Sequence, residues 1–206
     1  MNDYHFFKNR GQLMKETYSK NYFEKYAALT LATFFDIDEK DILLSDRPDL
    51  RIPLYHHGIE VTQALTPEEA VADMKKTLYK TLDMTPFDHD DQNISFVFEK
   101  IDDAIERKLI KCKKYERYLH NGLYIFSHCH NLSQESLKTF LIQKDVPHDF
   151  YHYLFINCVT KLYCFDIQKQ TIHSLSFRRN ELIKMNIQSL LYEKTCHKKR
   201  RKIIIP

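Results

Sequence analysis

Apolar and polar positions repeat with two different periods along the chain, and these periods predict a mixture of helices and strands. Apolar residues three and four apart are typical of amphipathic helices, whereas alternation or short apolar runs are typical of strands. We predict helices over residues 12–35, 66–82, 94–118, 133–142 and 179–193. Strands are predicted over residues 42–44, 50–54, 58–62, 123–126, 153–166 and 171–177, the last two as a hairpin. This interleaved order predicts an α/β fold, a central mixed sheet flanked by helices, with a C-terminal β-hairpin and helix.

Local signals set several of these boundaries. Thr66 is suited to the N-cap of a helix, and Glu69, three residues later, completes a capping box. Ser133 is the expected N-cap of the helix that follows it. The pair Asn121-Gly122 is typical of a helix C-terminus, so we expect the long helix over residues 94–118 to end there.

Composition favours one domain. The 206 residues are enough for one large core, and 43% hydrophobic with 29% charged residues is ordinary globular usage. We predict a single domain over residues 1–193 and a basic C-terminal tail over residues 194–206. The 13 Tyr and 14 Phe residues suit a packed core, and they could also stack on nucleic-acid bases.

The distribution of charge is more informative than its total. A net charge of +3 does not establish a nucleic-acid partner. Five consecutive cations near the C-terminus are typical of a contact with phosphates, although a solvated tail has the same composition. They are Lys198, Lys199, Arg200, Arg201 and Lys202.

Cysteine usage and hydropathy favour a cytoplasmic protein. The five cysteines include no CxxC pair, and the first ten residues contain no apolar run of the length that a signal peptide needs. No apolar stretch approaches the roughly 18 residues of a membrane span, so no membrane partner is expected.

Two carboxylates carry the most specific chemical signal. Asp49 and Glu60 enter neighbouring predicted strands, and a turn at residues 55–57 brings both to the same end of a hairpin. There they could share a hard divalent cation, which prefers oxygen ligands. Glu60 lies between Ile59 and Val61 in an apolar run, and a half-buried carboxylate needs a partner. The alternative is an exposed Glu on a two-faced strand.

At these residues the sequence resembles the PD-(D/E)XK nuclease superfamily. Pro48-Asp49 matches the first half of its motif, and residues 59–62 match a variant of the second half. The predicted order of helix, three-stranded meander, helix and strand also resembles the family's restriction-endonuclease-like core, over residues 12–126. The resemblance implies phosphodiester hydrolysis with Mg²⁺ or Mn²⁺, held by Asp49, Glu60 and the Val61 carbonyl.

The chain departs from the family at Thr62, where the motif usually has a lysine. Phosphodiester hydrolysis requires a cation near the attacking water and the phosphate, and threonine supplies none. On a helical projection Lys108 lies about 20° from the centre of the apolar stripe of the long helix. Such a lysine either finds an anion or extends its ammonium group to solvent. This arrangement resembles that of some family members, in which the lysine comes from a helix and not from the strand. The resemblance therefore implies that Lys108 replaces the lysine absent at position 62. Lys111, Lys113 and Lys114 follow as candidate nucleic-acid contacts.

The first helix supplies a third carboxylate. Glu24 shares one face with apolar residues, and in Holliday-junction resolvase-like members a Glu of this helix completes the metal site. The resemblance therefore implies that Glu24 is a metal ligand. Glu16 is the weaker alternative, and an exposed helical Glu is the ordinary explanation for either residue.

Three functions follow from these observations. The first is a metal-dependent nuclease acting on DNA rather than RNA, with a homodimer as one expected assembly. The second is a catalytically inactive descendant that binds nucleic acid, because Thr62 replaces the lysine. The third is a protein-interaction factor, such as an inhibitor carried by a phage or mobile element.

Overall fold

The structure, a computed structural model, describes residues 19–66, 69, 93–112, 115–130 and 132–203, with the side chains of residues 197–203 excepted. Most of the predicted helix over residues 66–82 lies outside the described residues, as do Glu16, Lys113 and Lys114. Its predicted start is present, because Thr66 N donates to Glu69 Oε2 at 2.9 Å and Glu69 N donates to Thr66 Oγ1 at 3.2 Å. Among the described helices, none is long and apolar enough to cross a membrane.

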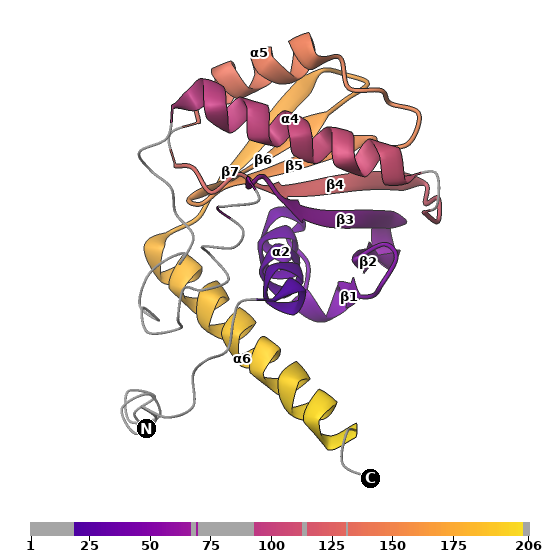
Figure 1. Ribbon diagram of the computed structural model, residues 1–206, viewed down its shortest axis with the longest axis vertical. Coiled ribbons are helices and arrows are strands. Elements are labelled where there is room, and N and C mark those ends of the chain that lie inside the picture. The colour runs from indigo at the N-terminus through magenta and orange to yellow at the C-terminus, as the bar shows by residue number, and fades with distance from the viewer. Residues whose placement is uncertain (1–18, 67–68, 70–92, 113–114, 131, 204–206) are drawn as a thin grey trace.

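Seven strands form one mixed sheet in the order of the sequence, from β1 to β7 (Figure 1). The strands are β1 (Leu43–Leu44), β2 (Leu50–Ile52), β3 (His57–Gln63), β4 (His120–Phe126), β5 (Tyr153–Cys158), β6 (Lys161–Asp166) and β7 (Thr171–Ser176). β3, β4 and β5 are parallel neighbours, and the other neighbours are antiparallel. The predicted α/β fold with a central mixed sheet is therefore confirmed.

Helices cover both faces of the sheet (Figure 1). The helices are α2 (Lys20–Phe35), α4 (Ile94–Lys111), α5 (Gln134–Lys144) and α6 (Arg179–Ile203), with short 3-10 turns η1 (Glu39–Asp41) and η2 (Pro53–Tyr55). α2 and α6 lie on one face, and α4 and α5 lie on the other. The order of α2, the meander β1–β3, α4 and β4 is the order predicted for the core.

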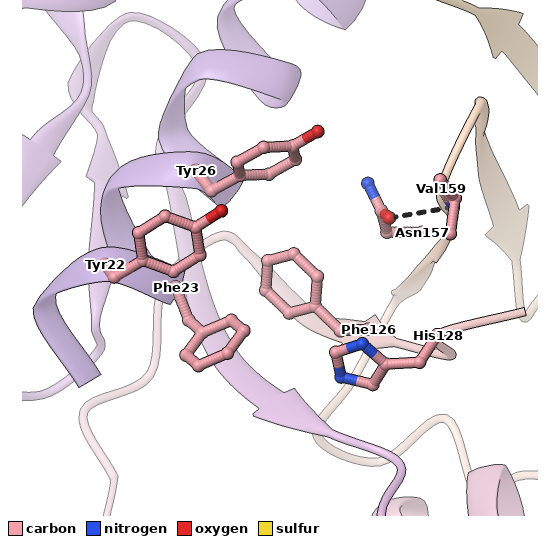
Figure 2. Close-up of a pocket in the computed structure, with 7 residues that line it drawn as sticks. All are labelled: Tyr22, Phe23, Tyr26, Phe126, His128, Asn157 and Val159. Atoms are coloured by element: carbon pink, nitrogen blue, oxygen red, sulfur yellow. Dashed lines mark hydrogen bonds between the residues drawn. The ribbon is translucent and has the colours of Figure 1, made fainter. Parts of the chain in front are cut away.

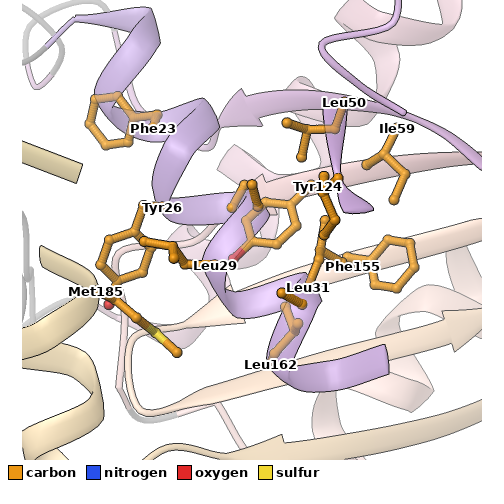
Figure 3. Close-up of a cluster of buried hydrophobic side chains, with 14 of the residues drawn as sticks. Phe23, Tyr26, Leu29, Leu31, Leu50, Ile59, Tyr124, Phe155, Leu162 and Met185 are labelled. Carbon is orange, nitrogen blue, oxygen red and sulfur yellow. The ribbon is translucent and has the colours of Figure 1, made fainter. Parts of the chain in front are cut away.

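Each face has its own hydrophobic core, because successive residues of a strand point to opposite sides. Tyr124 and Phe126 of β4 pack in the core beneath α2, whereas Leu123 and Ile125 pack beneath α4 and α5. Figure 3 shows the α2 core, in which Leu31 is fully buried near the sheet. The same alternation decides which face each side chain of β3 can reach.

The first described residues of α2 are held by polar contacts. Ser19 is the N-cap, and its hydroxyl accepts a hydrogen bond from Asn21 N at 3.3 Å. Its own backbone N–H donates to the buried Glu193 of α6 at 2.9 Å. Asp36 ends the helix in the left-handed conformation, with φ of 53°. These contacts fix the first turn of α2, which carries two residues of the site described below.

Three predicted boundaries were wrong. The long helix ends at Lys111, not near Tyr118, and the pair Asn121-Gly122 lies within β4. The segment predicted as one strand over residues 153–166 is the hairpin β5–β6, which turns at Val159 with φ of 56°. The last helix continues beyond residue 193, so the basic segment begins inside α6.

Candidate active site at the edge of strand β3

Asp49 lies directly before β2, beside a part of β3 that has no neighbouring strand on its outer edge among the described residues. β2 pairs with β3 only over His57 to Ile59, so the outer edge of β3 is free of strand partners from Glu60 onward among the described residues. The Asp49 carboxylate fills the next position, where its Oδ2 accepts a hydrogen bond from Val61 N at 2.8 Å. The Asp49 side chain is only 4% exposed. A carboxylate is thereby fixed at an open strand edge.

The Val61 carbonyl faces the same edge. In a β-strand the N–H and C=O groups of one residue point in the same direction, toward the same neighbour. Because the Val61 N–H points to Asp49, its carbonyl oxygen also points away from β4. This orientation agrees with the role implied for Val61.

The Glu60 side chain lies on the face of the sheet opposite α2, where it contacts Lys108 of α4. Its register partner Leu123 belongs to the α4–α5 core. Glu60 Oε2 accepts a hydrogen bond from Lys108 Nζ at 2.9 Å, and Lys108 Nζ also lies 4.0 Å from Asp49 Oδ2. Burial raises the pKa of Glu60, the charge of Lys108 opposes that shift and the charge of Asp49 adds to it. The expected anionic neighbour of Lys108 is therefore present.

Lys108 lies on the side of β3 to which Glu60 and Thr62 point. Thr62 follows Glu60 on the same face, since its register partner is Ile125 of the α4–α5 core. The Lys108 side chain is 16% exposed and lies close to the ring of Tyr115, with Nζ 6.0 Å from its centroid. Burial and the negative charges of Glu60 and Asp49 raise the pKa of Tyr115 to about 12. The lysine is thus held by a carboxylate and covered by an aromatic ring.

Glu24 approaches the same edge from α2. The residue is buried, and its Oε1 lies 3.1 Å from Lys20 Nζ, which in turn lies 2.8 Å from Asp49 Oδ1. Burial raises the pKa of Glu24 to about 7, the ammonium group of Lys20 opposes this shift and Asp49 adds to it. Four predicted residues from four parts of the chain are therefore brought together: Glu24, Asp49, Glu60 and Lys108.

Sequence reasoning missed Lys20, the second cation of this cluster. Its side chain is 59% exposed, and its ammonium group lies between Glu24 and Asp49. Burial lowers the pKa of Lys20, but hydrogen bonds to Asp49 and Glu24 outweigh that effect and raise it. The i,i+4 spacing between Lys20 and Glu24 is a sequence signal for the contact with Glu24.

The carboxylate oxygens of this cluster are the type of ligand that a hard divalent cation prefers. The carboxylates do not converge on one point, however, because lysine ammonium groups lie between them. In the parts of the chain that the structure describes, no three His, Cys, Asp or Glu side chains are arranged to hold a metal ion. Ammonium groups lie between the carboxylates instead, Lys20 between Glu24 and Asp49, and Lys108 beside Glu60. Buried Glu60 Oε1 has no hydrogen-bond donor of good geometry among the described residues, although the Tyr115 hydroxyl interacts with this carboxylate. A divalent cation would give this oxygen a stronger partner.

The aromatic pocket in Figure 2 has a different character from this cluster. It is lined by Tyr22, Phe23, Tyr26, Phe126, His128, Asn157 and Val159. Asn157 Oδ1 accepts from Val159 N at 3.1 Å, and Asn157 Nδ2 donates to the Tyr124 hydroxyl at 2.9 Å. None of the lining residues is an acid or a lysine. We therefore assign the candidate chemistry to the carboxylates at the edge of β3.

A cluster of histidines lies where β3, β4 and β5 begin. The rings of His57 and His120 are 4.9 Å apart, and those of His120 and His152 are 6.0 Å apart. Burial, together with the nearby His120 and His152, lowers the pKa of His57 to about 4. His57 is therefore neutral at pH 7, and protonating it places an unfavourable charge in a buried environment.

The buried His57 should make the protein less stable in acid. Its pKa is about 4 when folded and 6.5 when unfolded, so the unfolded state binds more protons between these values. Stability should fall as the pH drops from 6.5 toward 4, by up to about 3 kcal/mol at about 1.4 kcal/mol per pKa unit. Urea unfolding of wild type and His57→Phe at pH 7.5 and 4.5 measures this. An equal loss in both proteins would exclude His57 as its cause.

The predicted nucleic-acid contacts are only partly described. Lys111 ends α4 and is exposed. Lys198, Lys199, Arg200, Arg201 and Lys202 belong to the helical backbone of α6, but their side chains lie outside the described part.

Comparison with known proteins adds no relative: no family model, no curated protein and no solved structure matches the chain.

Proposed function

We propose that this protein is a divalent-metal-dependent nuclease that hydrolyses phosphodiester bonds in nucleic acid. The observation that carries the proposal is the meeting of Lys108 with Glu60 and Asp49 at the open edge of β3. A site that combines clustered carboxylates with a cation, drawn from separate elements, is a reasonable candidate for catalysis. The departure of the motif at Thr62 is compensated by the ammonium group of Lys108.

The roles follow from what each group can do at this edge. Asp49, Glu60 and the Val61 carbonyl would hold Mg²⁺ or Mn²⁺, with Glu24 as a further ligand. When bound, the ion would supply an acidified water and stabilise negative charge on the phosphate. Lys108 Nζ remains near both carboxylates and offers a positive charge to the phosphate oxygens. Glu60 orients this ammonium group through its 2.9 Å hydrogen bond.

We further propose that the protein is cytoplasmic and acts on DNA rather than RNA. Lys111 and the basic end of α6 would then contact the backbone phosphates. The cysteines are free in the structure, as expected for a reducing compartment. They are Cys112, Cys129, Cys158, Cys164 and Cys196. A homodimer would present two such edges to one duplex.

One observation favours the second candidate, a nucleic-acid-binding protein without catalytic activity. Each carboxylate already has a lysine within 3.1 Å, so the cluster is an ion-pair network that holds together without a metal. In that case the same contacts tie α2 and α4 to the sheet edge, and the site keeps only its affinity for phosphates.

The decisive experiment incubates the full chain with single- and double-stranded DNA and RNA in Mg²⁺, Mn²⁺ or EDTA. A nuclease should cleave at least one substrate with metal and none in EDTA. Electrophoretic binding assays in the same buffers identify the alternative. Retarded but uncut nucleic acid in all metals would favour the binding protein, and neither cleavage nor retardation would contradict both candidates.

A further inference from the structure

The candidate site holds more negative than positive charge. Glu24, Asp49 and Glu60 carry three negative charges when ionised, and Lys20 and Lys108 carry two positive ones. One negative charge is left over in a largely buried cluster. Glu24 Oε1 is paired with Lys20 Nζ at 3.1 Å, whereas Glu60 Oε1 is buried without a hydrogen-bond donor of good geometry among the described residues.

The two lysines are held very differently. The Lys108 side chain is 16% exposed, lies beneath the ring of Tyr115 and is bonded to the buried Glu60. The Lys20 side chain is 59% exposed and starts from the first turn of α2. Moving an exposed lysine costs little, because its stem is flexible and water solvates the released ammonium group. Lys20 is therefore the cation that can leave.

Lys20 also stands where a divalent cation would have to bind. Its Nζ is 2.8 Å from Asp49 Oδ1 and 3.1 Å from Glu24 Oε1, which are distances of direct contact with both carboxylates. Asp46, 88% exposed, is 3.7 Å from the same atom and could accept the ammonium group at the rim. A metal ion and this ammonium group cannot occupy the space between Glu24 and Asp49 together.

We propose that Lys20 is a displaceable internal counter-cation, which occupies the site in the metal-free protein and leaves when a divalent cation binds. The inference rests on the metal site of the proposed function. It assigns Lys20 a regulatory role, because competition by its charge sets the metal affinity below that of the three carboxylates alone. Lys108, which is largely enclosed and hydrogen-bonded to Glu60, stays in place.

Calorimetric titration of the full chain with Mn²⁺ at pH 8 tests the inference without nucleic acid. Lys20→Met removes the competing charge and should bind Mn²⁺ about tenfold more tightly than wild type, an order expected for one nearby charge in a partly solvated site. Lys20→Arg keeps the charge and should bind no more tightly than wild type. Lys40→Met removes an exposed lysine that pairs with Asp38 outside the site, and should leave the affinity unchanged.

Thermal melting gives a second measurement. In metal-free buffer Lys20→Met should melt below wild type, because Glu24 and Asp49 lose their partner, and Mn²⁺ should raise its Tm by more than it raises that of wild type. Equal or weaker Mn²⁺ binding by Lys20→Met, with wild-type binding abolished in Asp49→Asn, would overturn the role of Lys20 alone. No Mn²⁺ binding by any of the proteins would overturn the metal site and this inference with it.

Discussion

Glu60→Gln should reduce cleavage to a small fraction of the wild-type rate, by at least about 10²-fold. Changes beyond the ligand shell of a metal already cost about 10- to 100-fold, so the loss of a ligand charge should cost at least as much. The same substitution removes the negative charge of the hydrogen-bond partner of Lys108, which leaves Asp49, 4.0 Å away, as its nearby anion among the described residues. This substitution therefore affects both the proposed metal ligand and the position of the Lys108 ammonium group.

The control for Glu60→Gln is Glu116→Gln. Glu116 is also paired with a cation, since Arg51 Nη2 lies 3.3 Å from its Oε2, but its side chain is 59% exposed. Its neutralisation should leave cleavage within about twofold of wild type, because exposed ion pairs contribute little. Initial rates at saturating Mg²⁺, with urea unfolding of each variant, separate activity from stability. Wild-type cleavage by a folded Glu60→Gln would remove Glu60 from the mechanism.

The fold was largely predictable because α4 is clearly amphipathic and the inner strands are short apolar runs. The failures occurred where tertiary contacts replaced the usual local signals. The β5–β6 turn uses Val159, a residue rarely found at positive φ, and the Asn157 side chain stabilises it by accepting from Val159 N. Gly122 does not end a helix. A Cβ there would lie 2.9 Å from the Phe155 ring, so glycine allows β4 to approach that side chain.

Part of the candidate site was also predictable. The motif at Asp49 and Glu60 indicated the two strands, and the position of Lys108 on an apolar stripe indicated a buried anionic neighbour. Lys20 escaped prediction because an exposed lysine four residues before a glutamate is common on helices and stabilises them only weakly. Its contact with Asp49 joins α2 to the start of β2, and no spacing along the chain indicates that contact.

The site depends on both faces of the sheet. Glu24 and Lys20 reach the edge of β3 from α2, whereas Lys108 reaches it from α4 on the opposite face. This is possible because β2 is short and leaves the edge open beside Val61. A longer β2 would fill that edge with backbone hydrogen bonds and separate the two groups of side chains. The proposed function therefore requires that β2 is short.

Lys108→Met should keep the fold and bind Mn²⁺ at least as tightly as wild type, because a positive charge next to Glu60 is removed. It should nevertheless lose cleavage by about 10² or more, the scale of one lost electrostatic contact to the transition state. Methionine preserves the volume of the stem beneath Tyr115 and removes only the charge. The matched control is Lys111→Met, one turn further along α4, where the side chain is exposed. Because Lys111 is a proposed phosphate contact, Lys111→Met should weaken substrate binding, but its cleavage rate at saturating substrate should fall much less. Single-turnover cleavage at saturating Mn²⁺ measures both.

A second substitution tests whether the charge or the residue matters. Thr62 lies on the same face of β3 as Glu60, two residues further along the strand. Thr62→Lys in the Lys108→Met background should therefore restore part of the lost cleavage, because an ammonium group returns to the same carboxylate. Restoration of the rate at saturating Mn²⁺, where a change in metal affinity has no effect, would assign the effect to the phosphate side of the reaction. Full activity of Lys108→Met alone would contradict a catalytic role for the Lys108 ammonium group.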